Sequence, residues 1–368
     1  MCPYAHITGW GMAVPSRVLT NADLEKIVET DDAWIQSRTG ICQRHIVNED
    51  ESTATLAREA ALNALRVANL NPADLDLIIV STSSPEHVFP ATACLVQDRI
   101  GALHAGAFDL SAACSGFIFA VNMATQAIRS GSIQNAMVIG AETLSRFVNW
   151  QDRNTCILFG DGAGAFILQA GDEPGGLLSS VMRSDGSGGD LLSVPAGGSY
   201  KPASAETVQN HEHTIHMNGR EVFRFASRVI VQATKDVVAA ADMKIGDIQL
   251  VIPHQANLRI IEAAMRGLEI PMEQCFIDIE RYGNTSTASI PIATCEAIQQ
   301  GRLQYGNTIV FVGFGAGLTW GAALVRWTGP FLPHRHIYPA SYQLWVSIRS
   351  RLLRLLRRIE GWIWGRDR

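Results

Sequence analysis

Cys114 has the sequence context of a nucleophilic thiol. It follows the end of a predicted strand, Phe108–Leu110, and a turn of small residues, and it precedes a predicted helix over Ser115–Arg129. Unpaired N–H groups and the positive end of the helix dipole lower the pKa of a thiol placed there, which raises its thiolate fraction. On this context alone, a small buried cysteine in a packed turn is the alternative interpretation.

Two polar side chains elsewhere in the chain suit a site around this thiol. His254 follows a predicted buried strand, Leu250–Ile252, and Asn284 follows another, Phe276–Ile279. Ligands of α/β proteins bind beyond the carboxyl ends of the strands, so we expect His254 and Cys114 to face one crevice. An amide beside a histidine stabilises a carbonyl oxygen that becomes negative. Taken singly, His254 also fits a structural histidine, and Asn284 fits a turn or a helix cap.

Short β-branched runs alternate with amphipathic stretches, which predicts an α/β fold. We expect buried strands near 77–82, 136–140, 250–252 and 308–312, and helices over 53–68, 115–129 and 289–299. The string FGDGAGA at 159–165 is echoed by FGAGLTWGA at 314–322. This repeat predicts two similar halves joined near 171–190. The region 183–216 is rich in Gly, Ser and Pro, which predicts a long irregular loop between the halves that overhangs the site.

Composition narrows the class of protein. The chain has 368 residues, of which 47% are apolar and 18% charged, and no apolar run is long enough to cross a bilayer. The N-terminus lacks a signal-peptide pattern, so we predict a cytoplasmic protein. Seven dispersed cysteines without a CxxC pair argue against disulfides and structural zinc. The cluster His211–His216 lacks HExxH spacing, and FGDGAGA lacks the lysine of a phosphate-binding loop, so we predict neither a metal nor a nucleotide cofactor.

The C-terminal segment differs in charge from the rest of the chain. Residues 341–368 carry a net charge of +5, whereas the whole chain carries −5, so residues 1–340 carry −10. An acidic body is a poor nucleic-acid binder, and we predict no such partner. Between Tyr342 and Trp364, apolar residues recur at helical spacing with arginines on other faces. This basic amphipathic helix suits an anionic membrane surface, a partner helix or a functionless extension.

Several strings together give a specific resemblance. They are NADLEK at 21–26, DDAWIQSRTGI at 31–41, FPATAC at 89–94, PHQANLRII at 253–261, GNTSTAS at 283–289 and GAGLTWGAALV at 315–325, with Cys114 in an AAC-small-Gly setting. From about residue 5 to residue 328 the sequence resembles β-ketoacyl-acyl carrier protein synthase III of the thiolase superfamily.

The resemblance implies a fold and a reaction. The fold would be an α/β, thiolase-like one with two similar halves, 1–172 with the nucleophile and 173–328 with the His and Asn, in a five-layered αβαβα arrangement, followed by the basic extension 329–368. Members are usually homodimers. The implied reaction is a decarboxylating Claisen condensation, in which Cys114 takes an acyl group from acyl-CoA and malonyl-acyl carrier protein then attacks it. It needs no cofactor and makes the chain an acyltransferase that initiates fatty-acid synthesis.

The same resemblance assigns residues beyond Cys114, His254 and Asn284. The N–H groups of Cys114 and Ala316 would form the oxyanion hole, although the family frequently has three glycines where this chain reads Gly315-Ala316-Gly317. The residues for CoA would be Trp34, Arg38 and Arg153, and Phe89 would limit the acyl pocket across the dimer. The carrier protein would dock on Arg259, Arg224 and Arg266.

Three functions are compatible with the sequence. The first is the initiating condensation. The second is an acyltransferase or condensing enzyme of a secondary pathway that uses a different acceptor. The third is a membrane-recruited scaffold that has kept the fold without catalysis, which the intact set of Cys114, His254 and Asn284 argues against.

Overall fold

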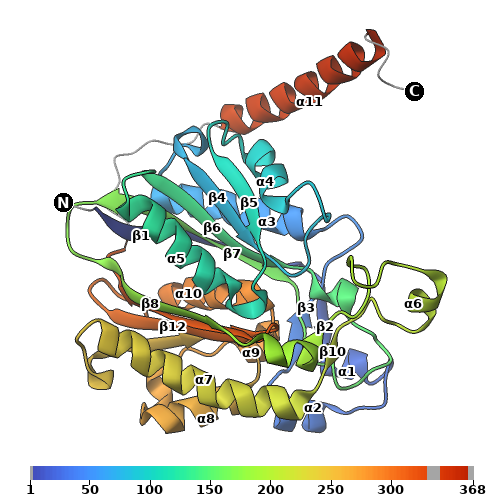
Figure 1. The fold of residues 1–368 in the computed structure, drawn as a ribbon, viewed down its shortest axis with the longest axis vertical. Coiled ribbons are helices and arrows are strands. Elements are labelled where there is room, and N and C mark those ends of the chain that lie inside the picture. Colours follow the sequence, from blue (N-terminus) through green and yellow to red (C-terminus); the bar gives the residue numbers. More distant parts are fainter. Residues whose placement is uncertain (1–2, 330–339, 364–368) are drawn as a thin grey trace.

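Two β-sheets form the centre of the protein in the computed structural model, which describes residues 3–329 and 340–363 (Figure 1). The first sheet has the strand order β1-β7-β6-β4-β5 and the second β11-β12-β13-β8. The strands of the first sheet are β1 (Tyr4–Ala13), β4 (Leu77–Ser81), β5 (Gly106–Leu110), β6 (Asn135–Glu142) and β7 (Gly162–Gly171). Those of the second are β8 (Gly176–Ser184), β11 (Leu250–Pro253), β12 (Thr308–Gly315) and β13 (Thr319–Arg326).

The two sheets share one topology. In the first, β6 is parallel to β4 and antiparallel to β7, which is antiparallel to β1. In the second, β12 is parallel to β11 and antiparallel to β13, which is antiparallel to β8. The two glycine strings therefore lie at equivalent turns, before β7 and before β13. The boundary predicted at residue 172 falls between β7 and β8.

The second sheet lacks a full counterpart of β5. Its place is taken by a single parallel bridge between Val251 and Cys275. The strand predicted over Phe276–Ile279 is therefore wrong, because the short helix α9 (Ile279–Tyr282) already begins there.

Helices cover both sheets and fill the space between them (Figure 1). The first sheet carries α3 (Thr53–Ala68) and α4 (Thr92–Ile100) on its outer face, and the second carries α7 (Gly219–Ala240) and α8 (Leu258–Leu268). Between the sheets lie α5 (Gly116–Arg129) and α10 (Ser289–Gln299), each in contact with strands of both. The layers thus follow the order αβαβα, as expected. The helices predicted over 53–68 and 289–299 are confirmed, whereas Ser115 belongs to a 3-10 turn before α5.

The middle layer explains why these segments are so apolar. Phe117, Ile118 and Val121 of α5 and Ile290 of α10 are at most 1% exposed and join one core with the inner faces of both sheets. Burial of each large apolar side chain contributes roughly 1.5–3 kcal/mol. The same core fixes the start of α5, and so the position of Cys114, relative to the second half.

Shorter elements surround the ends of the strands. They are β2 (Val18–Thr20), β3 (Gln43–His45), β9 (Leu192–Ser193), β10 (His216–Met217), α1 (Asn21–Leu24), α2 (Asp32–Thr39) and α6 (Ala205–Gln209). The region 183–216, predicted as an irregular loop, contains several of them.

The C-terminal extension forms one long helix, α11 (Ala340–Ile363), which leaves the body beside α4 (Figure 1). Residues 330–339 and 364–368 of the predicted extension lie outside the described residues. Among the residues that are described, no helix is long and apolar enough to cross a membrane. Cytoplasmic localisation stays a prediction.

Candidate active site

Cys114 lies in the 3-10 turn Ala113–Ser115 that joins β5 to α5, as the sequence predicts. Its side chain is 8% exposed. Ala113 has a φ of +46°, in the left-handed region that non-glycine residues seldom adopt. Such backbone strain is concentrated at functional sites, where the surrounding structure holds it. Here it sets the direction in which the following thiol points.

The electrostatics of Cys114 differ from the expectation. Burial raises the pKa of the thiol to about 12, and the nearby charge of Glu142 acts in the same direction. The prediction that the helix N-terminus lowers this pKa is therefore wrong for the free protein, because desolvation outweighs it. The Ser286 hydroxyl lies 3.2 Å from Sγ. The resting nucleophile is a neutral thiol that must pass its proton to another group.

His254 follows β11, and its N–H donates to Val312 O at 2.8 Å. The ring is 1% exposed, and burial lowers its pKa to about 3, so the imidazole is neutral at physiological pH. Ser289 Oγ lies 2.7 Å from Nδ1 and 2.9 Å from Ser286 O.

The single hydrogen of the Ser289 hydroxyl sets the tautomer of His254. Donated to Ser286 O, it requires a hydrogen on Nδ1 and leaves Nε2 as an acceptor. Donated to Nδ1, it leaves the hydrogen on Nε2, which then acts as a donor. Among the described residues Nε2 has no hydrogen-bond partner, although it is buried.

Asn284 is fixed by contacts with the first half. Its N–H donates to Leu158 O at 2.8 Å, and its carbonyl accepts from Gly160 N–H at 3.0 Å. The side-chain Oδ1 accepts from the backbone N–H of Ser286 at 2.9 Å. Because the oxygen is occupied, the amide presents its NH2 group as the free donor.

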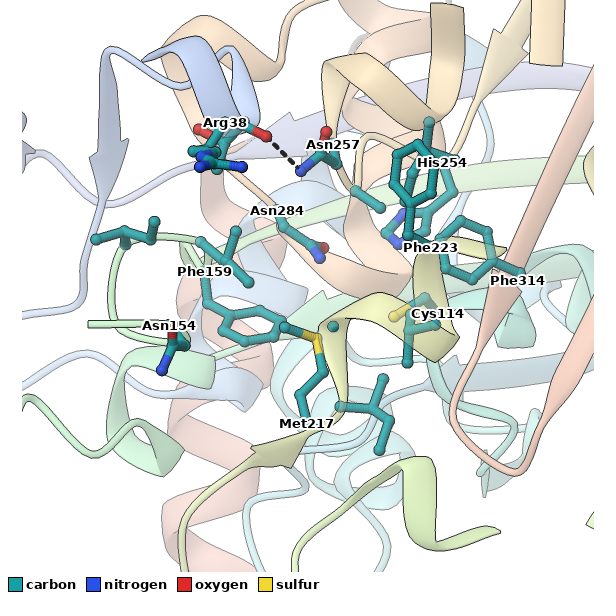
Figure 2. Close-up of a pocket in the computed structure, with 18 of the residues that line it drawn as sticks. Arg38, Cys114, Asn154, Phe159, Met217, Phe223, His254, Asn257, Asn284 and Phe314 are labelled. Atoms are coloured by element: carbon teal, nitrogen blue, oxygen red, sulfur yellow. Dashed lines mark hydrogen bonds between the residues drawn. The ribbon is translucent and has the colours of Figure 1, made fainter. Parts of the chain in front are cut away.

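The three side chains line one cavity of about 400 Å³ (Figure 2). The sequence prediction that Cys114, His254 and the crevice belong together is thus met by the geometry. A second cavity, of about 390 Å³, also has Cys114 in its wall and is largely apolar, with Leu144, Phe147, Val194 and Ile215 among its lining residues. Val194 and Ile215 come from the region 183–216, which the sequence placed beside the site. Cys114 is therefore part of the wall of both cavities, together with Phe159 and Leu192.

The end of β12 lies against the backbone of Cys114. A Cβ on Gly315 would lie 2.6 Å from the backbone N of Cys114, so only glycine allows this approach. Ala316 lines the second cavity together with Cys114. The positive φ of this loop is at Gly317, at +134°, and not at Ala316. The methyl group of Ala316 is accommodated without backbone strain.

The residues predicted to bind CoA lie at the mouth of the first cavity. Trp34 and Arg38, both on α2, line it, and Asn257 donates to the Arg38 carbonyl at 3.0 Å (Figure 2). The Arg153 guanidinium covers the Trp34 ring at 4.9 Å from its centroid. Phe89 is 84% exposed and lines neither cavity of its own chain.

The three arginines predicted to meet the carrier protein lie on the paired helices α7 and α8 and are exposed. Arg259 lies over the ring of Phe223, which lines the first cavity. Arg224 forms an ion pair with Glu221 and Arg266 with Glu262, each on its own helix. Arg259 thus contacts a side chain of the cavity wall, whereas Arg224 and Arg266 are paired with carboxylates of their own helices.

The sequence prediction missed three polar residues. Ser286 and Ser289 belong to the string GNTSTAS, whose run of hydroxyl residues was the available signal. Glu142 ends the otherwise apolar strand β6 and is fully buried. A charged residue at a buried position is rare, and that is the signal for Glu142.

The histidines of the 211–216 cluster have other partners. His213 Nε2 lies 2.8 Å from Thr207 Oγ1, and His216 Nε2 lies 3.2 Å from His211 O. Within residues 3–329 and 340–363 no group of three or more His, Cys, Asp or Glu side chains is arranged to hold a metal.

Comparison with known families gives two matches that cover much of the body. Residues 108–186 match the model described as 3-oxoacyl-[acyl-carrier-protein (ACP)] synthase III, and residues 238–327 match the model of its C-terminal part. The matched segments contain Cys114, His254 and Asn284, and they end before α11.

Individual relatives extend over most of the chain. The chain is 52% identical over 328 residues to a β-ketoacyl-[acyl-carrier-protein] synthase III of Roseiflexus sp. (strain RS-1), covering 89% of this chain and 100% of the relative. It is 53% identical over 322 residues to that of Desulfitobacterium hafniense (strain DSM 10664 / DCB-2), covering 88% and 97%. The crystal structure of 3-oxoacyl-[acyl-carrier-protein] synthase III from Aquifex aeolicus VF5 matches with a TM-score of 0.82 at 47% identity, covering 88% of this chain and 100% of that one.

Proposed function

The chain belongs to the β-ketoacyl-[acyl-carrier-protein] synthase III family of thiolase-like condensing enzymes and initiates fatty-acid synthesis, and we propose that Cys114, His254 and Asn284 perform its chemistry. Its substrates are an acyl-CoA and malonyl-acyl carrier protein. The observation that carries the proposal is that these three side chains, drawn from both halves, line one cavity.

The first step is acyl transfer to Cys114. Sγ attacks the thioester carbonyl of acyl-CoA, and CoA leaves as its thiol. A thiolate is both a good nucleophile and a good leaving group, so the acyl-enzyme is close in energy to its thioester precursor. The N–H groups of Cys114 and Ala316 stabilise the oxyanion. The largely apolar second cavity is suited to the acyl chain.

The second step is decarboxylation and attack. Malonyl-acyl carrier protein loses CO2, and the resulting enolate oxygen accepts hydrogen bonds from the Asn284 amide and from Nε2 of neutral His254. The second donor requires the tautomer in which Ser289 donates to Nδ1. One such donor contributes roughly 3–4 kcal/mol to transition-state stabilisation. The carbanion attacks the acyl carbonyl and releases Cys114. No cofactor takes part.

Intact mass tests the roles directly. Wild-type protein is mixed with acetyl-, isobutyryl- and octanoyl-CoA beside Cys114→Ala, and malonyl-acyl carrier protein follows. We expect one acyl adduct on the wild type, none on the variant, and discharge with CO2 release. Acylation without discharge would indicate the alternative acceptor of a secondary pathway. No adduct with any thioester would contradict the roles proposed for the three residues.

Two further groups of residues complete this proposal. Trp34, Arg38 and Arg153 bind the adenine and phosphates of CoA by stacking and by charged hydrogen bonds. Arg259, Arg224 and Arg266 attract the acidic carrier protein. Arg259→Glu should raise KM for malonyl-acyl carrier protein at low salt and leave KM for acyl-CoA unchanged. A raised KM for acyl-CoA with an unchanged KM for malonyl-acyl carrier protein would instead show that Arg259 binds CoA.

We also propose a homodimer built on the first half. β5 is an edge strand with Phe108 37% exposed, and Val88 and Phe89 are 88% and 84% exposed. In the dimer Phe89 would limit the partner's acyl pocket. Phe89→Asp should give a monomer by light scattering, whereas Val208→Asp, at a site on α6 that is 62% exposed, should leave the dimer intact.

For α11 we propose contact with an anionic membrane surface. One side of the helix is held by the body: Val346 is 4% exposed against α4, and Ser350 Oγ donates to Asp98 at 2.6 Å. Apolar residues on the opposite side are 43–63% exposed: Leu344, Trp345, Ile348, Leu352, Leu355, Leu356 and Ile359.

The charges of α11 suit lipid headgroups. Arg349 and Arg351 flank the exposed apolar side at opposite edges, because they directly precede and follow Ser350, which faces the body, on a helix of 3.6 residues per turn. An apolar stripe bordered by arginines is the pattern of a helix that lies in the plane of an anionic interface. A large exposed apolar surface of this kind is normally covered.

Vesicle flotation tests whether the exposed apolar side of α11 binds a membrane or a second copy of the chain. Wild type should float with vesicles of phosphatidylcholine containing phosphatidylglycerol, and less at high salt, but not with phosphatidylcholine alone. Deletion of 341–368, or Leu352→Glu, should abolish flotation with turnover unchanged, whereas Val208→Glu should not. Self-association that depends on α11 without flotation would replace the membrane by a second copy of the chain.

A further inference from the structure

The buried carboxylate of Glu142 lies close to the nucleophile Cys114 and has no part in the mechanism described above. Glu142 is fully buried at the end of β6. Its carboxylate accepts from Ser83 N–H at 3.1 Å, Ser84 Oγ at 2.5 Å and Thr82 Oγ1 at 3.3 Å, and from Ser286 Oγ and Thr287 Oγ1, each at 3.0 Å. Among the described residues, no lysine or arginine forms an ion pair with it. A buried charge held only by neutral donors is costly, which points to a role in the reaction.

The Ser286 hydroxyl connects this carboxylate to the thiol. Its Oγ lies 3.2 Å from Cys114 Sγ and 3.0 Å from Glu142 Oε1. A hydroxyl has one hydrogen and can also accept. With the hydrogen directed to the carboxylate, Oγ is free to accept from the thiol, so Sγ–H, Oγ–H and the carboxylate form one chain of hydrogen bonds.

We propose that Ser286 and Glu142 form a proton relay that takes the thiol proton of Cys114 during acyl transfer and returns it during condensation. This inference rests on the proposed role of Cys114 as nucleophile. Ser286 touches the reacting sulfur, whereas Glu142 acts through it as a positioning residue and a store for the proton.

The relay balances over both steps. As Sγ attacks the acyl carbonyl, its proton passes to Ser286 Oγ, and the hydroxyl proton of Ser286 passes to Glu142 Oε1. The carbon–sulfur bond to CoA breaks, and the CoA thiolate takes a proton from solvent. When the malonyl-derived carbanion attacks the acyl-enzyme, the bond to Sγ breaks, and the proton on Glu142 returns through Ser286.

His254 is the other candidate acceptor, and its surroundings make it the weaker one. Burial lowers the pKa of its ring to about 3, whereas burial raises the pKa of Glu142. A carboxylate with a raised pKa accepts a proton more readily, and an imidazole with a lowered pKa accepts it less readily. The hydrogen-bonding neighbours of Glu142 are uncharged, and Cys114 is the titratable group on which its charge acts. With the relay in place, His254 stays neutral for decarboxylation.

Single-turnover acylation by acetyl-CoA, followed by intact mass across a pH series, tests the relay beside malonyl decarboxylation. Ser286→Ala removes the hydroxyl but keeps the backbone N–H that orients Asn284. We expect acylation to slow roughly a hundredfold, in line with the loss of acid–base catalysis, with decarboxylation changed by less than about threefold. Glu142→Gln should do the same and remove the acidic limb of the acylation pH profile.

Thr287→Val is the matched control, because it removes a donor to Glu142 that does not touch Sγ. We expect it to keep the acidic limb. Equal losses of acylation and decarboxylation in Ser286→Ala would assign Ser286 a structural role and overturn the relay, as would an acidic limb that persists in a folded Glu142→Gln. Should Glu142→Gln not fold, Ser286→Ala decides alone. An unacylated wild type would instead overturn the proposed role of Cys114, and the relay with it.

Discussion

The two halves share one scaffold but contribute opposite kinds of chemistry. The first half supplies the groups that change covalent or protonation state, Cys114 and Glu142, and the second supplies neutral hydrogen-bonding groups, His254, Asn284 and Ser286. Cys114 and Asn284 occupy comparable places in the two halves. Cys114 comes after β5, and Asn284 comes after the bridge at Cys275, which takes the place of β5 in the second sheet.

Each half also holds the reacting group of the other. Gly160, in the turn before β7, donates to the carbonyl of Asn284, and Gly315, at the equivalent turn of the second half, approaches the backbone N of Cys114. The repeated fold thus brings two different sites face to face. Acyl transfer takes place on Cys114 of the first half, whereas decarboxylation uses the side chains of His254 and Asn284 of the second half, so each step can be impaired separately.

Substitution of the nucleophile should give the largest difference between the loss of acylation and the loss of decarboxylation. Cys114→Ala should reduce acylation by roughly a thousandfold or more, because no other group in the cavity replaces a thiolate. Decarboxylation of malonyl-acyl carrier protein should persist, since its donors lie in the second half. Intact mass measures the first activity and CO2 release the second. Loss of both would show that the halves do not act separately.

Asn284→Ala should give the reverse pattern. Loss of one donor to the enolate oxygen should slow decarboxylation about 10²–10³-fold. Acylation of Cys114 should stay within a few-fold of wild type, because the oxyanion hole for that step is built from backbone N–H groups. Asn284→Asp serves as a second variant that keeps the size of the side chain but removes the donor. Slower acylation in both variants would place Asn284 in the first step.

The sequence placed Cys114 and His254 in one crevice because each follows the end of a strand of an α/β fold, whereas the strand predicted before Asn284 was wrong. Singly, Cys114, His254 and Asn284 each had a structural alternative, and their assignment as one set came from the strings that resemble the synthase III family. The helices over 53–68 and 289–299 followed from apolar periodicity that matches their burial. The prediction of a lowered pKa for Cys114 was wrong. It took account of the helix N-terminus, which the sequence shows, but not of the desolvation of Sγ, which arises only when the second half covers the thiol. Glu142 was missed because its partners, Ser84 and Ser286, are far away in the chain.

A matched pair of glycine substitutions tests whether each half holds the other. Gly315→Ala places a methyl group 2.6 Å from Cys114 N, and Gly160→Ala places one against the carbonyl of Tyr282, next to the segment that bears Asn284. Displacement of a reacting group from its proper position slows the step that it performs, here by about tenfold to a hundredfold. We expect the first variant to lose mainly acylation and the second mainly decarboxylation. Gly246→Ala, where no atom lies within 4 Å, is the control and should lose neither.

The smallest effect sharpens the contrast between the buried titratable groups. His254 has a pKa of about 3 in the folded protein and about 6.5 when unfolded, so between these values only the unfolded chain binds a proton. The free energy of unfolding should therefore fall as pH falls below about 6.5, by up to ~1.4 kcal/mol per pH unit from this group. His254→Gln lacks this contribution, so the stability of the wild type relative to the variant should decrease between about pH 6 and pH 4 in urea unfolding.

The contribution of Glu142 to the free energy of unfolding has the opposite pH dependence, because its raised pKa makes the folded state bind the proton first as pH falls. Glu142→Gln should accordingly remove a stabilisation that the wild type gains on acidification, and equal slopes in both variants would contradict the assignment of neutral groups to one half and a proton-binding carboxylate to the other.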